Sequence, residues 1–325
     1  MLTVFLPGPD GMERIDDPDL EKGLPGTPMW IDLIAPDDAT VTEVERQLSI
    51  DVPDSEELGR IETSSRLIAA NNTFLMTYTG LSRELAARTQ TPVTCILTET
   101  TLLTIRQPGA LAYDVIAKQF NRAGDRPHSP QGILFALLGA TIDRLADRLA
   151  HLGNQIDTVM NEVFGSGANS RRSSRRVQVL IKSLGWHGSH LLKVQDSLVS
   201  LQRLALFLRQ HADTIAKDTY DNTAIATMVE DLRSLSEFAE ALDGKVEFLL
   251  DAMLGLIDLD QNQIMKIISM LAAMFLPATL ISSIFGMNFR YMPELAWHHG
   301  FLLSLGVMGL SAVVMAFLFR WRRWM

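Results

Sequence analysis

The sequence predicts an α/β domain followed by long helices that continue into a two-helix transmembrane hairpin. Three observations indicate this fold class. Short apolar and β-branched runs are confined to residues 1–107, a heptad pattern extends to residue 256, and two long uncharged apolar runs lie near the end. We expect an α/β domain at residues 1–130 and long helices, including a stalk helix, at residues 131–263.

The first part of the chain contains five runs that are typical of strands. They are rich in apolar and β-branched residues and alternate with helical patterns at residues 40–48 and 55–61. This alternation favours an α/β domain. The expected strands are residues 2–6, 29–34, 74–78, 91–97 and 102–105.

Helical periodicity dominates from about residue 131. One long helix is expected to run to residue 163 and a second to about residue 216. The last cytoplasmic stretch then repeats apolar residues at alternating spacings of three and four, which is a heptad seam. Such a seam can pack on the two preceding helices of its own chain or on other subunits, and the two kinds of packing can coexist in one assembly. The seam residues are Ile225, Met228, Leu232, Leu235, Ala239, Leu242, Val246, Leu249, Met253 and Leu256.

Two segments near the end are long enough to cross a membrane. No residue is charged at 267–289, and none at 295–319 when His298 and His299 are neutral. A helix needs about 20 apolar residues to cross the hydrocarbon core. We therefore expect a first transmembrane helix at residues 264–289, an outer loop at 290–300, a second helix at 301–320 and a basic tail at 321–325.

Positive charge predicts the orientation of this hairpin. Lys266 precedes the first span, and Arg320, Arg322 and Arg323 follow the second. The positive-inside rule then places both termini in the cytoplasm. The N-terminal residues lack the apolar core of a signal peptide, so the C-terminal spans are expected to carry the membrane address.

The first span carries a stripe of small and polar residues. The stripe positions are separated by three or four residues and so share one helix face: Ser269, Ala272, Leu276, Thr279, Ser283 and Gly286. Small residues permit close helix packing, and aligned hydroxyls can also line a wet path. The stripe lacks the nitrogen and sulfur ligands that zinc favours, whereas neutral oxygens suit the water shell of magnesium.

Charge and composition exclude several classes of protein. The net charge of −9 argues against a nucleic-acid partner, and the single cysteine, Cys95, excludes an internal disulfide framework. Cys95 lies in an expected strand, where a cysteine is typically a small buried hydrophobe. The sequence lacks a phosphate-binding Gly-x-x-x-x-Gly-Lys-Ser/Thr loop and an evident nucleophile–base pair. We expect neither an enzyme nor an organic cofactor.

The loop after the first span carries the most specific motifs. The first is Gly286-Met287-Asn288, and the second is Met-Pro-Glu-Leu at residues 292–295. Together, in this membrane position, they resemble the CorA family of magnesium transporters. A Leu-Pro-x-Thr pattern at residues 276–279 and Trp-Ile-Asp-Leu at residues 30–33 extend the resemblance over most of the chain.

The resemblance implies a homopentameric funnel in the bacterial inner membrane, with the first span of each subunit lining the pore. The transported ion would be Mg²⁺, and Mg²⁺ bound at acidic sites would also regulate the channel. The motif residues Gly286, Met287 and Asn288 would form the selectivity filter, and Glu294 would lie at the pore mouth. The implied pore-lining residues are Asn262, Ile268, Leu276, Thr279 and Ser283. Candidate regulatory acids are Glu84, Asp213, Asp218 and Asp221.

Two alternatives remain open at this point. One keeps the fold but transports zinc, cobalt or nickel, and the pair His298 and His299 near the pore mouth suits such ions. Arg290, where many family members have an acid, also weakens the expected attraction of cations to the mouth. The other alternative is a membrane-tethered helical scaffold without transport, against which the polar stripe and the Gly-Met-Asn motif argue. Self-association and contact with lipid are expected in each case.

Overall fold

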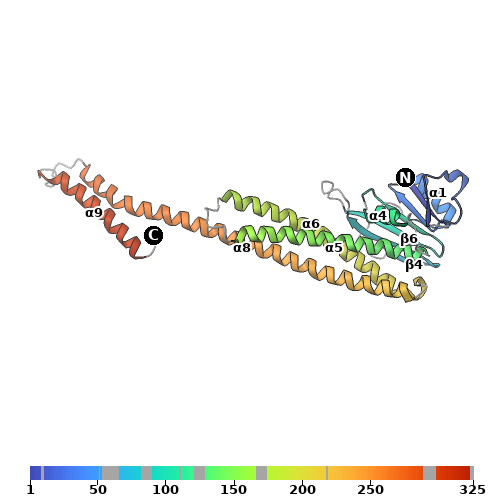
Figure 1. The fold of residues 1–325 in the computed structure, drawn as a ribbon. Coiled ribbons are helices and arrows are strands. Elements are labelled where there is room, and N and C mark those ends of the chain that lie inside the picture. Colours follow the sequence, from blue (N-terminus) through green and yellow to red (C-terminus); the bar gives the residue numbers. More distant parts are fainter. Residues whose placement is uncertain are drawn as a thin grey trace. The chain divides into compact units, whose positions relative to one another are not determined.

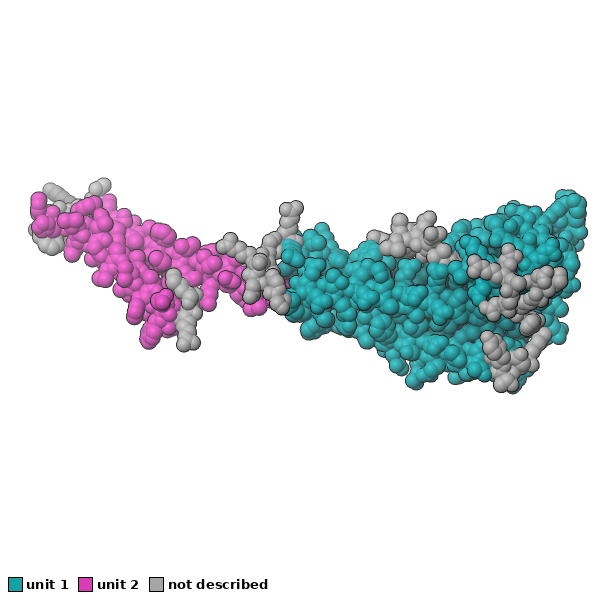
Figure 2. Space-filling view, in the orientation of Figure 1, with its two compact units in different colours: residues 1–248 teal, residues 249–325 magenta. Residues whose placement is uncertain are grey.

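The computed structural model describes most of the chain in two compact units. The units are Met1–Phe248 and Leu249–Met325 (Figure 2). The expected helix at residues 55–61 lies outside the described residues. The described residues are 1–8, 11–50, 52, 66–81, 90–109, 111–120, 129–165, 174–216, 219–287 and 298–322.

A mixed sheet forms the centre of the first unit. Among the described residues it has seven strands in the order β2-β1-β3-β7-β6-β5-β4, and only the β3–β7 pair is parallel. The antiparallel neighbours are consecutive strands of the chain, except β1 and β3, between which β2 lies in sequence. The parallel pair joins segments about 70 residues apart in sequence. The strands are β1 (Leu2–Pro7), β2 (Met12–Asp16), β3 (Trp30–Ile34), β4 (Leu67–Ala70), β5 (Thr73–Leu81), β6 (Gln90–Leu97) and β7 (Leu102–Arg106).

Helices cover both faces of this sheet. Helix α1 (Asp38–Leu48) packs on one face through Val44, against Ile31 and Leu33 of β3. The opposite face carries α4 (Leu111–Phe120), α5 (Pro130–Phe164) and α6 (Ser174–Gln210) (Figure 1). Burial on both faces explains why β3 and β7 are apolar without strict alternation.

A buried ion pair lies on the α4 side of the sheet. The Arg106 guanidinium donates to both carboxylate oxygens of Asp32, from Nε at 3.1 Å to each and from Nη2 at 2.9 Å. Thr104 donates to Asp32 at 2.7 Å, and Arg106 also donates to Asp114 of α4 at 2.8 Å. The Trp30 indole N–H donates to Thr104 Oγ1 at 2.9 Å. These bonds join β3, β7 and α4. Each one stabilises the fold, because it pairs a charge or a donor that burial would otherwise leave without a partner.

Three long helices make the rest of the first unit. The heptad seam of α8 (Thr219–Phe285) is buried from Ile225 to Val246 and packs on α5 and α6. A Cβ placed on Gly153 of α5 would lie 3.5 Å from Leu242, and one on Gly188 of α6 would lie 3.4 Å from Val246. Packing within one chain thus accounts for this part of the seam.

The second unit contains the end of α8 and the whole of α9 (Gly300–Trp321). Both helices are long and apolar enough to cross a membrane. The predicted stalk and first span therefore belong to one helix that ends at Phe285. The boundary that we predict at residue 263 falls inside this helix and stays a prediction.

Four short elements were not predicted, and one predicted helix is divided in two. The unpredicted elements are β2, β4, the 3-10 helix η1 (Leu20–Lys22) and the ten-residue helix α4. Strands β2 and β4 lie at the two edges of the sheet and expose most of their side chains. Strand β2 has no apolar run, whereas β4 is an apolar run of only four residues. The second long helix was expected to reach residue 216, but α6 ends at Gln210 and α7 (Ala212–Ile215) follows.

Replacing Arg106 with methionine should destabilise the first unit strongly. The change leaves the Asp32 carboxylate buried without its cation, which typically costs about 3–5 kcal/mol of unfolding free energy. Urea unfolding of the full chain in detergent, followed by pulse proteolysis of this unit, measures the loss. The control is Lys245→Met, which removes the half-exposed ion pair with Asp157 and should cost less than ~1 kcal/mol. Equal losses in both variants would contradict the role given to the buried pair.

The Cys95 thiol should be inert in the folded protein. Burial raises its pKa to about 12, so the reactive thiolate is scarce at neutral pH. A water-soluble disulfide reagent should leave Cys95 unmodified at pH 7.5 until guanidinium unfolds the chain. Rapid stoichiometric reaction of the folded protein would contradict this expectation.

Candidate functional site

The end of α8 has two distinct faces. The stripe residues are exposed, whereas the rest of the chain partly covers a second set of residues. This second set is residues 270, 273, 274, 277, 278, 281 and 285. At 100° per residue these two sets lie on opposite sides of the helix. Of the predicted pore-lining residues, Leu276, Thr279 and Ser283 lie on the exposed side. Asn262 and Ile268 lie at residues 261–269, where every residue is exposed, so their side of the helix is not distinguished. The structure therefore places three of the expected pore-lining residues on one open face.

Thr279 shows how a hydroxyl can serve this face. Its Oγ1 lies 2.7 Å from the Phe275 carbonyl oxygen and 3.0 Å from that of Leu276, and it donates its proton to these acceptors. The oxygen lone pairs then remain to accept from water on the exposed side. Pro277 lacks an N–H, so the carbonyl of Ala273 also loses its helical donor. The Thr279 hydroxyl thus presents an oxygen acceptor on the exposed side, whereas residues 273 and 277 lie on the partly covered side. A neutral acceptor of this kind suits the water shell of a hard cation.

The Gly-Met-Asn motif begins where α8 ends. The Gly286 N–H donates to the carbonyls of Ser282 and Ser283 at 2.9 and 3.2 Å, and the Met287 N–H donates to Ile284 at 3.3 Å. A Cβ on residue 286 would lie 3.2 Å from the Ser282 carbonyl oxygen, so glycine permits this tight end. Asn288 and Glu294 lie outside the described residues, and their roles stay predictions.

The candidate regulatory acids do not form a visible metal site. Asp213 is exposed on α7, and Asp221 is buried in the first turn of α8. Glu84 and Asp218 lie outside the described residues. Within the described part of the chain, no three His, Cys, Asp or Glu side chains are grouped as a metal would need. His298 and His299 have their rings 5.1 Å apart just before α9, and that pair does not complete such a group.

Comparison with known proteins assigns the family. A sequence model of the family described as CorA-like Mg²⁺ transporter protein matches residues 26–323. The chain belongs to this CorA family. CorA proteins are transporters, so the expectation that the chain is not an enzyme is confirmed.

Relatives and a solved structure agree with this assignment. The chain is 27% identical over 305 residues to the magnesium transport protein CorA of Wolinella succinogenes, covering 91% of both chains. It is 26% identical over 300 residues to that of Escherichia coli strain K12, covering 91% of this chain and 92% of the relative. The complete CorA magnesium transporter from Methanocaldococcus jannaschii has the same fold, with a TM-score of 0.79 at 19% identity over 100% of this chain and 99% of that one. The predicted CorA fold class is thereby confirmed.

Cysteine substitution tests whether the exposed side of the transmembrane end of α8 contacts water. Thr279→Cys lies on the exposed stripe and Ala278→Cys on the partly covered side. If the stripe lines water, a charged thiol reagent should modify the Thr279→Cys variant at least about tenfold faster than the Ala278→Cys variant, because the reactive thiolate forms readily only in water. The unsubstituted chain is the control, since Cys95 is buried. Equal rates in the two variants would contradict a wet stripe.

Proposed function

We propose that the chain is one subunit of a homopentameric magnesium channel in the bacterial inner membrane, with both termini in the cytoplasm. The single observation that carries this proposal is the exposed oxygen-bearing face of α8, which leads directly into the Gly-Met-Asn motif. A helix that crosses a lipid bilayer gains nothing by turning hydroxyls and small residues toward lipid. Copies of the same helix around a central axis would instead turn this face toward water.

Neutral oxygens explain how such a pore would select its ion. Mg²⁺ holds its water strongly, so a filter of Asn288 amides can accept hydrogen bonds from that water without stripping it. An uncharged ring also lets the ion leave again. The apolar side chains of Leu276 and Ile268 would form narrow rings between the polar ones, where expulsion of water closes the path.

The membrane potential supplies the driving force in this proposal. A divalent cation that moves inward through about 100 mV releases roughly 4.6 kcal/mol, twice the value for a single charge. Uptake therefore needs no nucleotide hydrolysis. The transported Mg²⁺ is the substrate, and the proposal assigns no organic cofactor to the chain.

Feedback by cytoplasmic Mg²⁺ completes the proposal. The family resemblance places regulatory ions between the cytoplasmic domains of neighbouring subunits, where acids from two chains meet. Exposed Asp213 suits such a role, because its carboxylate can face another chain. Because α8 contains both the heptad seam and the pore face, a displacement of the seam would be transmitted along one helix.

Flux into liposomes tests the transport function. Reconstituted wild type should admit Mg²⁺ under an inside-negative potential. The Asn288→Ala variant should take up Mg²⁺ about tenfold more slowly, because it loses a hydrogen bond worth ~1.4 kcal/mol. Ser283→Ala on the stripe should lower it less, and Ser282→Ala, one position away from the stripe, is its matched control. Zinc uptake without magnesium uptake would favour the zinc, cobalt or nickel alternative. Absence of both fluxes in wild type would favour the scaffold.

Neutralising a candidate sensor acid should weaken feedback. Asp213→Asn removes one charge from an exposed position, so more internal Mg²⁺ should be needed to halve the uptake rate. Liposomes loaded with a series of Mg²⁺ concentrations measure the internal concentration that halves uptake, for wild type and for the Asp213→Asn variant. Asp243→Asn, an exposed acid in the middle of α8, is the control. An unchanged dependence on internal Mg²⁺ in Asp213→Asn would remove this residue from the sensor.

A further inference from the structure

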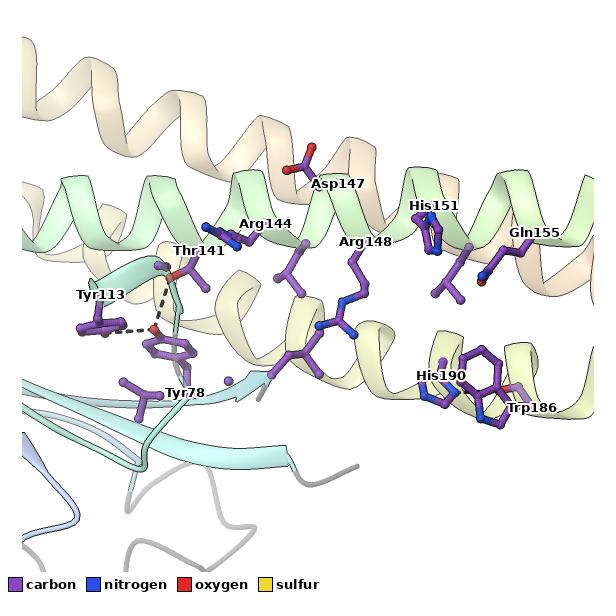
Figure 3. A pocket seen from close by; sticks show the side chains of 17 residues that line it. Tyr78, Tyr113, Thr141, Arg144, Asp147, Arg148, His151, Gln155, Trp186 and His190 are labelled. Atoms are coloured by element: carbon purple, nitrogen blue, oxygen red, sulfur yellow. Dashed lines mark hydrogen bonds between the residues drawn. The ribbon is translucent and has the colours of Figure 1, made fainter. Parts of the chain in front are cut away.

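A cavity of about 360 Å³ lies on the helical side of the sheet in the first unit. Strands β5 and β6 form its floor, and α4, α5 and α6 form its walls (Figure 3). Its volume is in the range of pockets that hold small organic ligands. Among the described residues, neither the predicted pore-lining residues of α8 nor Asp213 and Asp221 contribute to its lining.

Cationic side chains gather at one wall of this cavity. Arg144 and Arg148 are one turn apart on α5, and His151 follows on the same face. Arg144 is exposed and Arg148 is half-buried. Like charges four residues apart repel each other weakly on a helix, and a bound anion would relieve that repulsion. Within the described part of the chain, neither guanidinium has an ion pair or a hydrogen bond.

The acid in the lining does not neutralise these arginines. Asp147 lies between them in sequence, but its carboxylate points to the other side of α5 from Arg148, which points toward α6 (Figure 3). No ion pair joins it to a described cation. Two positive charges therefore face the cavity in a chain whose net charge is −9.

Aromatic and apolar groups make the remaining walls. Trp186 of α6 is half-buried, with its ring centroid 3.9 Å from that of His190. The hydroxyls of Tyr78 and Tyr113 are 3.0 Å apart and so satisfy each other. Aliphatic side chains complete the surface, namely Leu81, Val93, Leu145 and Leu152. Such walls suit a planar, largely apolar body.

His190 is held with one nitrogen available. Its Nδ1 lies 2.8 Å from the Trp186 carbonyl oxygen, which can only accept, so Nδ1 carries the proton. The Nε2 atom is then the one left for a ligand, as an acceptor when the ring is neutral and a donor when it is charged. A hydrogen bond within α6 thus orients an imidazole in the cavity lining.

We propose that this cavity binds a phosphate monoester of a compound with a planar ring, of about mononucleotide size. A phosphate monoester carries a charge of about −1.5 to −2 at neutral pH, which matches two guanidiniums. Guanidiniums bind phosphate oxygens in paired hydrogen bonds, and a single carboxylate would leave one arginine unmatched. The planar ring occupies the wall around Trp186.

Calorimetry with the full chain in detergent tests this site without any ion gradient. The probes are the 5′-monophosphates of adenosine, guanosine and uridine, their unphosphorylated nucleosides, and inorganic phosphate. At least one monophosphate should bind at micromolar concentration, and its nucleoside and inorganic phosphate at least tenfold more weakly. The proposal is overturned if every monophosphate needs more than about 1 mM, or if phosphate alone binds as tightly.

Matched variants assign the binding to this cavity. Arg148→Gln should weaken the monophosphate at least tenfold, and Arg144→Gln provides a second, independent variant if the first fails to fold. Arg203→Gln, an exposed arginine of α6 outside the cavity, should bind as the wild type does. Unchanged binding in both cavity variants would place the ligand elsewhere and overturn the assignment. If wild type binds no monophosphate and these variants lose their oligomers, the proposal is overturned. The arginines would then belong to a subunit interface.

Discussion

The transmembrane part of α8 is constrained by the mismatch between its two sides. The partly covered side faces the rest of its own chain, and the other exposes the hydroxyls and small side chains of the stripe together with large apolar residues such as Leu271, Phe275 and Leu280. The Thr279 hydroxyl donates to backbone carbonyls, so what it offers on this side is an acceptor for water. The proposed pentamer would turn the stripe toward water and leave the apolar residues to lipid or to neighbouring copies.

The central ion pair of the first unit is satisfied internally, whereas three other buried polar atoms, Gln131 Oε1, His187 Nδ1 and Ser197 Oγ, lack a hydrogen-bond partner among the described residues. Asp32 and Arg106 neutralise each other between β3 and β7, and Thr104 and Asp114 complete their hydrogen bonds. The two arginines of α5 differ from this pair, because Arg144 is exposed and Arg148 is half-buried. Their charge is partly solvated, and it is the adjoining cavity with its aromatic wall that points to a ligand.

Sequence periodicity predicted the long elements well and the short ones unevenly. The heptad seam and the uncharged runs led correctly to α8 and α9, since each repeats one simple pattern over many turns. Strand β2 gave little signal because an edge strand needs no apolar face of its own. Strand β4 gave little because its apolar run is only four residues long. The cavity arginines also gave little signal, because a four-residue spacing of arginines is common on solvated helices.

The sequence by itself determined the two apolar segments long enough to span a membrane, the order of the long elements and the positions that share the small and polar stripe of α8. These depend on local composition and helix periodicity, which act along the chain. Only the tertiary structure decided that Arg106 contacts Asp32 and that the heptad seam before residue 249 packs inside one chain. It also decided that α4, α5, α6 and two strands line a cavity. Those contacts join residues far apart in sequence, and their formation depends on how whole elements pack rather than on any local pattern.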